Sequence, residues 1–347
     1  MTTNQLRWGL LAAGGIAAEF ADGVARSDTG TVVAVAARDA DRAAAFASTF
    51  GIERSHGSYE ALLADPDVDI VYISTLHPQH AEWAIKATEA GKHVLCEKPL
   101  TMNAADSARV IDSARRNDVF LMEAFMYRSH PQTDKLVELV RSGVLGELRA
   151  IDVAFSYDAG RDPRSRAYLN ELGGGGILDI GCYGTSIARL VVAAATGVDV
   201  AEPSRIVATA RLHPTEGTDL ESEALLTFDG GINAHLSCAV DYVRDNHVRV
   251  FGTDAWIDVP VPSWLDESRH AGTSHLLVHH ADGRTETVDA VATKSLFTYE
   301  ADTVARALPA RQSPTVTWDE TLANMRTLDR WREAIGLVYN CEKKEAS

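Results

Sequence analysis

The side chain best placed to do chemistry is Lys98, which follows a short apolar strand and precedes a proline. Residues 91–100 read GKHVLCEKPL and begin with a glycine of the kind that ends a helix. In an open α/β sheet, ligands bind at the carboxyl ends of the strands, so a charged residue at such an end reaches the reacting groups. The alternative is a strand end whose lysine is simply solvated.

Asp179 and Tyr183 form a second candidate pair for catalysis. They lie four residues apart, in a segment that opens a helix after the four glycines 173–176, so they are expected to share one helix face. A phenol is a poor base at neutral pH, but a nearby ammonium group favours the phenolate. We therefore expect Lys98, Tyr183 and Asp179 to act together on a hydroxyl group. The structural alternatives are an N-cap aspartate and a half-buried core tyrosine.

A strand, a tight turn and a helix at the start of the chain form the candidate cofactor site. The dinucleotide fingerprint G-x-G-x-x-G/A has its three places filled by Ala12, Gly14 and Ala17. Gly14 still lets the backbone approach a pyrophosphate, and Ala17 still permits close helix packing, although Ala12 replaces the first glycine. The expected cofactor contacts in this turn are Ala12, Gly14, Gly15 and Ile16.

The residue after the second strand, Thr31 to Ala37, indicates which cofactor binds. A carboxylate ending that strand would bind the ribose hydroxyls of NAD, whereas Arg38 can pair with a 2′-phosphate and stack on adenine. NADP is therefore the expected cofactor, and the adjacent Asp39 keeps NAD as the alternative. The alternative is that Arg38 has no part in cofactor binding and only caps the end of the strand.

The GKHVLCEKPL segment resembles the signature of the glucose-fructose oxidoreductase/inositol dehydrogenase (Gfo/Idh/MocA) family, and the resemblance covers nearly the whole chain. It implies that Lys98 lies beside the nicotinamide and the substrate hydroxyl. It also implies cofactor contacts from the loop after the fourth strand, although loop histidines are often bystanders. The additional cofactor residues are Thr75, Leu76, Pro78, His80, Glu97 and Lys98.

The second motif narrows the resemblance to one branch of the family. Where the family usually has Asp-x-x-x-His, this chain has Asp179 and Tyr183, as in dimeric dihydrodiol dehydrogenases and NADP-dependent D-xylose 1-dehydrogenases. The aromatic-diol enzymes carry Trp at the place of Met126, so Met126 favours a sugar. The substrate contacts expected from the resemblance are Met126, Arg128, Phe155, Asp179 and Tyr183.

Length and composition indicate a two-domain globular protein with small-molecule partners. The chain has 347 residues, more than one core normally supports, and is 46% apolar and 24% charged. Its net charge of −16 argues against nucleic-acid or anionic-membrane partners. We expect no membrane-spanning apolar run, no signal peptide in the first six residues and a cytoplasmic location. The cysteines Cys96, Cys182, Cys238 and Cys341 are scattered, which predicts reduced thiols and no metal site.

The pattern of strands and helices predicts an α/β fold. An N-terminal Rossmann NAD(P)-binding domain is expected at 1–125, and a C-terminal α+β domain with a large open, mainly antiparallel sheet at 126–347. Predicted elements of the first domain are a strand from Asp69 to Thr75, helices from Ala81 to Ala90 and from Asn103 to Arg116, and a strand from Val119 to Glu123. Those of the second are strands from Leu148 to Tyr157, Ser204 to Leu212, Ser222 to Phe228, Ile232 to Val240 and His247 to Phe251. The resemblance implies a homodimer or homotetramer formed through this sheet.

Together these patterns predict an NADP-dependent oxidoreductase that transfers hydride between nicotinamide and a sugar or diol hydroxyl carbon. An aldose 1-dehydrogenase of the D-xylose/D-glucose type is the leading interpretation. The sequence leaves open whether Lys98 or Tyr183 carries the proton. The alternatives are a reductase of keto-sugars or dicarbonyls and, in another class, a non-catalytic NADP-responsive regulator.

Overall fold

The computed structural model describes residues 5–260 and 270–343, and the chain divides into two compact units. The first unit runs through His130 and also includes Thr293–Thr321. The second comprises Pro131–Ala292 and the chain from Leu322 onward. The domain boundary between residues 125 and 126 stays a prediction. The return of Thr293–Thr321 to the first unit differs from the expectation that everything after residue 125 forms one domain.

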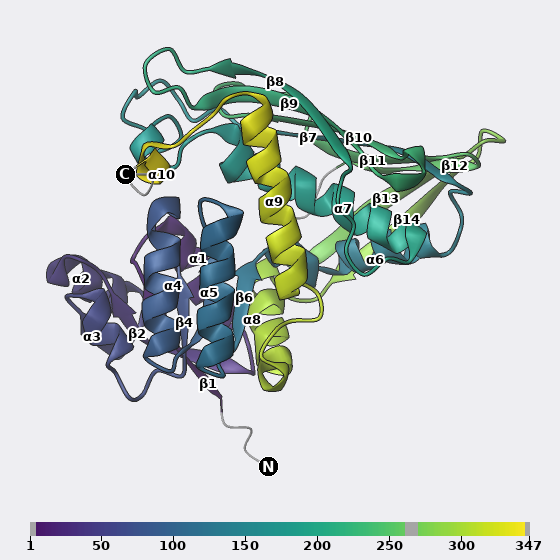
Figure 1. Ribbon diagram of the computed structural model, residues 1–347. Helices are drawn as coiled ribbons and strands as arrows, with labels where there is room; N and C mark the ends of the chain where they lie inside the picture. The colour runs from purple at the N-terminus through teal and green to yellow at the C-terminus, as the bar shows by residue number, and fades with distance from the viewer. Residues whose placement is uncertain (1–4, 261–269, 344–347) are drawn as a thin grey trace. The chain divides into compact units, whose positions relative to one another are not determined.

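The first unit is built on sheet A, which has six parallel strands in the order β3-β2-β1-β4-β5-β6 (Figure 1). The strands are β1 (Leu6–Leu11), β2 (Gly30–Ala36), β3 (Arg54–His56), β4 (Ile70–Ile73), β5 (His93–Glu97) and β6 (Leu121–Ala124). The strand order changes direction between β1 and β4, which is where ligands bind in open α/β sheets. The predicted Rossmann fold is confirmed.

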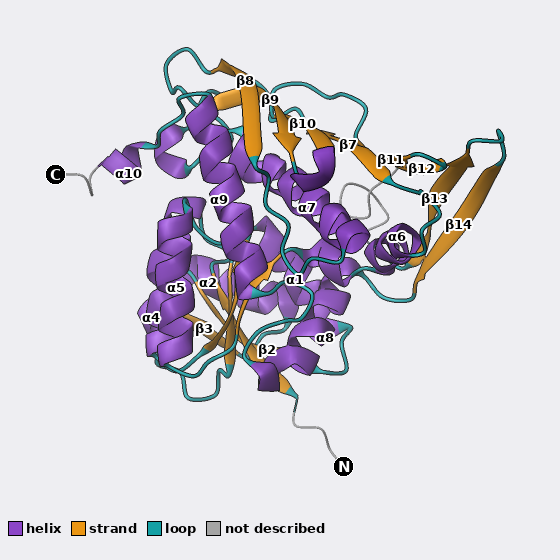
Figure 2. Cartoon of the chain, turned by 45° about the vertical axis from the view of Figure 1, so that its right-hand side comes forward, coloured by secondary structure: helices purple, strands orange, loops and turns teal. Residues whose placement is uncertain are grey.

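Helices cover both faces of sheet A. They are α1 (Gly15–Ala25), α2 (Ala40–Phe50), α3 (Tyr59–Leu63), α4 (His80–Glu89), α5 (Ala104–Arg116) and α8 (Leu296–Ala307), with short 3-10 turns η1 (His77–Gln79), η2 (Met126–Ser129) and η7 (Leu308–Ala310). Figure 2 shows strands of the sheet between the pair α4 and α5 and the pair α1 and α8. The helix predicted from Asn103 is confirmed as α5, and the Asn103 side chain caps it by accepting a hydrogen bond from the Asp106 N–H at 2.9 Å.

The returning segment joins the first unit because α8 packs closely on α1. A Cβ on Gly23 of α1 would lie 2.5 Å from the Cβ of Phe297 in α8, so only glycine permits this approach. Asp302 of α8 accepts hydrogen bonds from Ser27 at 2.6 Å and from Lys294 at 2.6 Å. Contacts between residues so distant in the chain leave no local pattern, which is why the sequence did not predict them.

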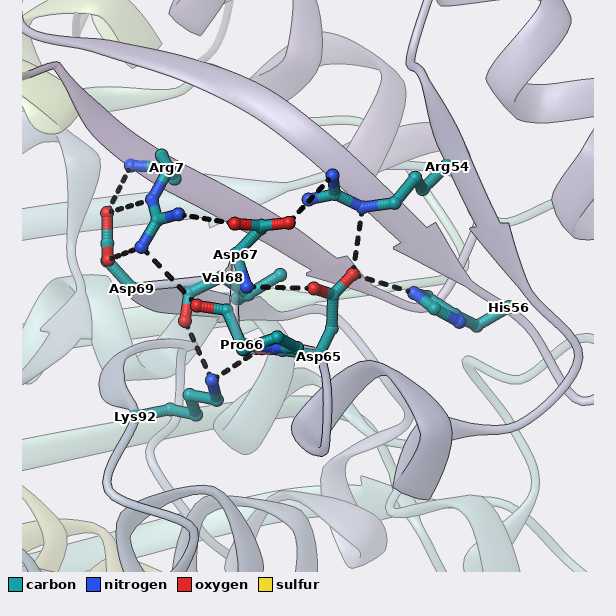
Figure 3. A network of polar contacts seen from close by, with 9 residues as sticks. All are labelled: Arg7, Arg54, His56, Asp65, Pro66, Asp67, Val68, Asp69 and Lys92. Atoms are coloured by element: carbon teal, nitrogen blue, oxygen red, sulfur yellow. Dashed lines mark hydrogen bonds and ion pairs between the residues drawn. The ribbon is translucent and has the colours of Figure 1, made fainter.

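Charged side chains tie together the segments that enter β1, β4 and β5 (Figure 3). Arg7 donates to the Asp69 carboxylate at 2.7 and 3.0 Å, and Arg54 donates to Asp65 at 2.9 Å. Lys92 is buried and donates to two main-chain carbonyl oxygens at 2.7 and 2.8 Å. Burial lowers the pKa of the Lys92 ammonium, against the raising effect of the nearby carboxylates. This network lies at the amino-terminal edge of the sheet, away from the strand ends that carry the candidate site, so its role is structural.

The second unit is built on sheet B, whose eight strands run in the order β14-β13-β12-β11-β7-β10-β9-β8. They are β7 (Leu148–Ser156), β8 (Arg205–Leu212), β9 (Asp219–Thr227), β10 (Asn233–Ala239), β11 (His247–Gly252), β12 (Ala255–Val259), β13 (Gly272–His280) and β14 (Thr285–Ala292). Among the described strands of sheet B, only β7 and β10 pair in parallel, so the predicted mainly antiparallel sheet is confirmed. The strands β12, β13 and β14 were not predicted.

One face of sheet B is covered by α7 (Cys182–Thr196), with α6 (Pro131–Arg141) beside it. A π-helix, Ile177–Gly181, precedes α7. Further described helices are η3 (Asn170–Leu172), η5 (Asp229–Gly231), α10 (Asn340–Lys343) and α9 (Trp318–Ala334), the last of which begins in the first unit. The expectation of no apolar run long enough for a membrane was wrong, because Asn170–Thr196 passes that test by composition. Its most apolar window is 83% buried within the fold, as in the core helix of a globular unit.

Candidate active site

The turn between β1 and α1 has the geometry of a phosphate-binding loop. Ala12 has a φ of +102°, in the region that favours glycine, so the fingerprint's first glycine position keeps its backbone shape despite the substitution. A Cβ on Gly14 or Gly15 would meet no atom within 4 Å in the described part of the chain. This open side, at the amino-terminal end of α1, fits a pyrophosphate.

Two buried hydroxyl groups point to a ligand at the end of β4. The Oγ of Ser74 and the Oγ1 of Thr75 are buried and have no hydrogen-bond partner among residues 5–260 and 270–343. Buried polar groups are normally paired, so these two atoms fit hydrogen bonding to a bound molecule. The Ser74 N–H donates to the Leu11 carbonyl oxygen at 3.1 Å, which places these hydroxyls beside the glycine turn.

Two exposed arginines lie where the second strand ends. Arg38 is exposed just after β2, and Arg42 stands in the first turn of α2 and donates to the carbonyl oxygen of Ala13 at 3.0 Å. Burial raises the pKa of Tyr59, and the charges of both arginines oppose that shift, so both guanidinium groups lie near one phenol. Asp39, the residue that kept NAD as an alternative, caps α2 through the Arg42 N–H at 3.1 Å. The sequence analysis did not select Arg42. Its position four residues after Arg38, at the start of the following helix, could have indicated a second cation near the end of β2.

The Glu-Lys-Pro turn follows β5 directly. Lys98 is half-buried, and its peptide bond to Pro99 is cis. Glu97 is buried, accepts a hydrogen bond from the hydroxyl of Tyr72, and accepts another from the Lys98 N–H at 3.2 Å. The carboxylate of Glu97 therefore fixes the backbone of the turn that presents Lys98.

The loop after β4 is bound to the same turn through His80. This histidine is fully buried, with Nδ1 2.9 Å from the Pro99 carbonyl oxygen and Nε2 3.0 Å from the Thr75 carbonyl oxygen. The structure thus brings three predicted cofactor residues, Thr75, His80 and Lys98, to adjacent loops at the carboxyl end of sheet A. Leu76 and Pro78 are half-buried in the same loop.

Two predicted substrate residues, Met126 and Arg128, lie in η2 of the first unit. Both are buried, and an Arg128 guanidinium nitrogen lies 3.9 Å from a carboxylate oxygen of Glu320. Glu320 lies in the first turn of α9, where its N–H donates to the Thr317 hydroxyl at 3.2 Å. Met126 and Arg128 are thus buried within the first unit, where Arg128 lies near Glu320.

The candidate residues of the second unit gather around Asp179. Tyr157, just after β7, donates its hydroxyl hydrogen bond to the Asp179 carboxylate, and a guanidinium nitrogen of Arg166 lies 3.5 Å from it. Asp179 and Tyr183 are both buried, and Phe155 is buried on β7. Sequence reasoning did not select Tyr157 or Arg166, because they come from a loop whose shape has no local signature.

Asp179 lies in the π-helix and Tyr183 in the first turn of α7, so the segment that joins them is helical but not a regular α-helix throughout. That their side chains share one helix face stays a prediction. Lys98 belongs to the first unit, whereas Asp179 and Tyr183 belong to the second. That these three side chains meet at one substrate carbon stays a prediction.

Sequence profiles of known families match both halves of the chain. The profile described as "Oxidoreductase family, NAD-binding Rossmann fold" matches residues 6–125, and that described as "GFO/IDH/MocA C-terminal domain" matches residues 133–258. The chain belongs to the Gfo/Idh/MocA oxidoreductase family. The first domain of this Gfo/Idh/MocA protein is therefore an NAD(P)-binding Rossmann domain, and the protein is an oxidoreductase.

Relatives of known activity match over almost their whole length. Trans-1,2-dihydrobenzene-1,2-diol dehydrogenase of Mus musculus is 34% identical, covering 98% of this chain and 99% of the relative. D-xylose 1-dehydrogenase (NADP(+)) 2 of Haloferax volcanii is 35% identical, covering 93% and 95%. Among solved structures, KijD10, a 3-ketoreductase from Actinomadura kijaniata in complex with NADP and TDP-benzene, superposes with a TM-score of 0.84 at 28% identity, covering 96% and 98%.

Side chains that could bind a metal ion do not gather in the described part of the chain. No group of three or more His, Cys, Asp or Glu side chains within residues 5–260 and 270–343 could hold one. Three of the four cysteines are buried, and all four are free thiols. The catalytic roles of Lys98, Tyr183 and Asp179 stay predictions.

Proposed function

We propose that this oxidoreductase is an NADP-dependent aldose 1-dehydrogenase that oxidises the anomeric hydroxyl carbon of a D-xylose- or D-glucose-type sugar. The observation that carries the proposal is the buried Asp179 carboxylate, held between the Tyr157 hydroxyl and the exposed Arg166 guanidinium. A carboxylate ringed by hydrogen-bonding side chains suits a ligand with several hydroxyl groups. The D-xylose 1-dehydrogenase relative supports the same substrate class.

Cofactor preference follows from the charge at the end of β2. Arg38 and Arg42 place two cations beside the glycine turn, where a 2′-phosphate would bind, and Asp39 is occupied in capping α2. The relative from Haloferax volcanii is named for NADP, and KijD10 was solved with NADP. When bound, the cofactor accepts or supplies the hydride.

The protein's own part is to bind, orient and deprotonate the sugar. Asp179 would accept a hydrogen bond from a sugar hydroxyl and fix the reacting carbon. Tyr183 would take the hydroxyl proton with the Lys98 ammonium favouring its phenolate, or Lys98 would take the proton itself. His80 and Glu97 would keep the backbone of the Lys98 turn in place.

A second candidate activity is reduction of a keto-sugar at the same site. The structural likeness to a 3-ketoreductase favours it, since the same residues would then donate the proton. A non-catalytic NADP-responsive regulator is the remaining alternative, and it predicts cofactor binding without turnover on any polyol.

Initial rates on a substrate panel test these candidates. Aldoses and diols are supplied with NADP⁺ or NAD⁺, and ketoses, keto-sugars and dicarbonyls with the reduced cofactors, while reduced-nicotinamide absorbance is followed. Fastest turnover of an aldopentose or aldohexose with NADP⁺ supports the proposal. Faster turnover of ketones with NADPH supports the reductase, and cofactor binding without any turnover supports the regulator.

We also propose that the protein forms a homodimer or homotetramer through the open face of sheet B. Val207 on β8 lies opposite Leu225 on β9, and both side chains are about half exposed, at 49% and 47%. Exposed apolar pairs on a flat sheet favour association with another surface. Light scattering coupled to size exclusion tests this, with a monomer mass as the contradicting result.

A further inference from the structure

Asp219, the first residue of β9, is fully buried against the glycine turn that precedes Asp179. Its Oδ2 accepts a hydrogen bond from the Ile177 N–H at 2.7 Å, at the start of the π-helix. A Cβ on Gly175, whose φ is +109°, would lie 2.2 Å from Oδ1. The carboxylate thus occupies the space that only a glycine leaves free.

The same turn also holds the loop that carries Arg166. The Gly175 N–H donates to the carbonyl oxygen of Ala167 at 2.8 Å. Thr218, the residue before Asp219, donates its hydroxyl hydrogen bond to the Tyr168 carbonyl oxygen at 2.7 Å. The entrance of β9 therefore contacts both segments that converge on the Asp179 carboxylate.

The carboxylate of Asp219 lies in a largely uncharged environment. Its Oδ1 has no hydrogen-bond partner among the described residues. Cys238 of β10 and Tyr339 are buried beside it, and Tyr339 donates to the Gly174 carbonyl oxygen at 2.7 Å. The nearby cation, Arg332 of α9, is engaged by Glu342 at 3.0 Å. The hydrogen bond that Asp219 accepts from the Ile177 N–H is thus its main stabilising contact with the turn.

We propose that Asp219 is a positioning residue for substrate binding, which fixes the turn from which Asp179 and Tyr183 project. The inference rests on the proposed function, because it assumes that Asp179 contacts the sugar. Asp219 touches neither substrate nor cofactor. It acts by holding the Ile177 N–H, and so the first turn of the π-helix, against β9.

Two substitutions separate the hydrogen bond from the bulk of the side chain. Asp219→Asn keeps an oxygen acceptor of the same shape, whereas Asp219→Ala removes it. We expect D219A to lower kcat/KM for the sugar by about tenfold to a hundredfold, mainly through KM, because small misplacements of positioning groups are costly. D219N is expected to stay within about threefold of the wild type. NADPH affinity should be unchanged in both, since the candidate cofactor residues lie in the first unit.

Ser222→Ala is the matched control. Ser222 is equally buried on β9 and accepts a hydrogen bond from Trp331 Nε1 at 2.9 Å. Its loss should lower stability and leave KM unchanged. A D219A enzyme with wild-type KM, or a D219N enzyme impaired as much as D219A, would overturn the positioning role.

Hydrogen exchange separates this inference from the proposed function. We expect peptides spanning residues 173–183 to exchange faster in D219A than in the wild type or D219N, whatever the substrate proves to be. Equal exchange in D219A and the wild type contradicts the inference. Absence of turnover in the wild type, with faster exchange in D219A, contradicts only the proposed function.

Discussion

The imidazole Nδ1 of His80 lies 2.9 Å from the carbonyl oxygen of Pro99. Its other ring nitrogen lies 3.0 Å from the Thr75 carbonyl oxygen, so one buried ring links the loop after β4 to the turn that presents Lys98. A neutral imidazole has one N–H to donate, and only the protonated ring can donate to both carbonyl oxygens. His80 is therefore central to the shape of the crevice at the end of sheet A.

Replacing His80 should impair cofactor binding and turnover together. We expect His80→Ala to weaken NADPH binding by about tenfold or more, because the turn before Lys98 and the loop after β4 lose the ring that links them. Fluorescence titration of reduced cofactor measures the effect. Asp67→Asn, in the charged network at the amino-terminal edge of the sheet, is the control and should bind NADPH normally. Unaltered binding in H80A would refute the role assigned to His80.

Removing Arg38 should change the choice of cofactor. Arg38→Ala is expected to lower kcat/KM by about tenfold or more with NADP⁺ and by much less with NAD⁺, because NAD⁺ lacks the 2′-phosphate with which the guanidinium would pair. Initial rates with both cofactors give the ratio. Arg26→Ala, an exposed arginine at the far end of α1, should leave the ratio unchanged. Equal losses with both cofactors would argue against a 2′-phosphate contact.

The positive φ of Ala12 predicts a stabilising substitution. Ala12→Gly should raise the free energy of unfolding by about 1 kcal/mol, because strain in the left-handed region exceeds the entropy cost of glycine there. Ala18→Gly, in the helical part of α1, should instead lower it by about 0.5–1 kcal/mol. Chemical denaturation of both variants measures the contrast. A destabilised A12G variant would contradict the strain.

Glu300 on α8 predicts a pH dependence of stability. Burial raises the pKa of its carboxyl well above the ordinary value of 4.5, and the nearby Glu97 adds to the shift. The folded state keeps the proton that the unfolded state loses, so this group's contribution to stability is complete below about pH 4.5 and is lost as pH rises toward the folded pKa. Glu300→Gln cannot ionise, so this loss of stability at higher pH should be absent in the variant.

Thermal melts of E300Q and the wild type between about pH 5 and about pH 8 test this dependence. The unfolding free energy of E300Q relative to the wild type should rise with pH, by up to about 1.4 kcal/mol per pH unit. The difference between their melting temperatures should rise with it. Glu82→Gln, an exposed residue on α4, should show no such trend. A constant difference between E300Q and the wild type would mean that Glu300 ionises normally.

The sequence predicted those features that have a local pattern. The strand, turn and helix around Gly14, the helix that follows Asn103 and the strand before Lys98 each depend on neighbours in the chain, and all three are present in the structure. The register of α8 on α1 depends instead on Gly23 and Phe297, which are far apart in sequence. No periodicity records such a contact.

In the candidate site, too, some features have a local sequence pattern and others depend on residues far apart in the chain. Asp179 was recognised from a motif, whereas Tyr157 and Arg166 reach it from a loop that only the fold can place. The π-helix at Ile177–Gly181 also escaped prediction, because it follows from the fit of the glycine turn around Asp219 rather than from residue spacing. Tertiary contacts decide both features.

Single-turnover hydride transfer tests the central claim, that the Lys98 amine and the Tyr183 phenol act on one substrate carbon. Lys98→Met and Tyr183→Phe, each saturated with NADP⁺ and mixed with the best aldose, should form reduced nicotinamide at least about a hundredfold more slowly than the wild type. Cofactor affinity should be retained in both, and Lys86→Met and Tyr242→Phe should react normally. Wild-type rates in both K98M and Y183F would contradict the account.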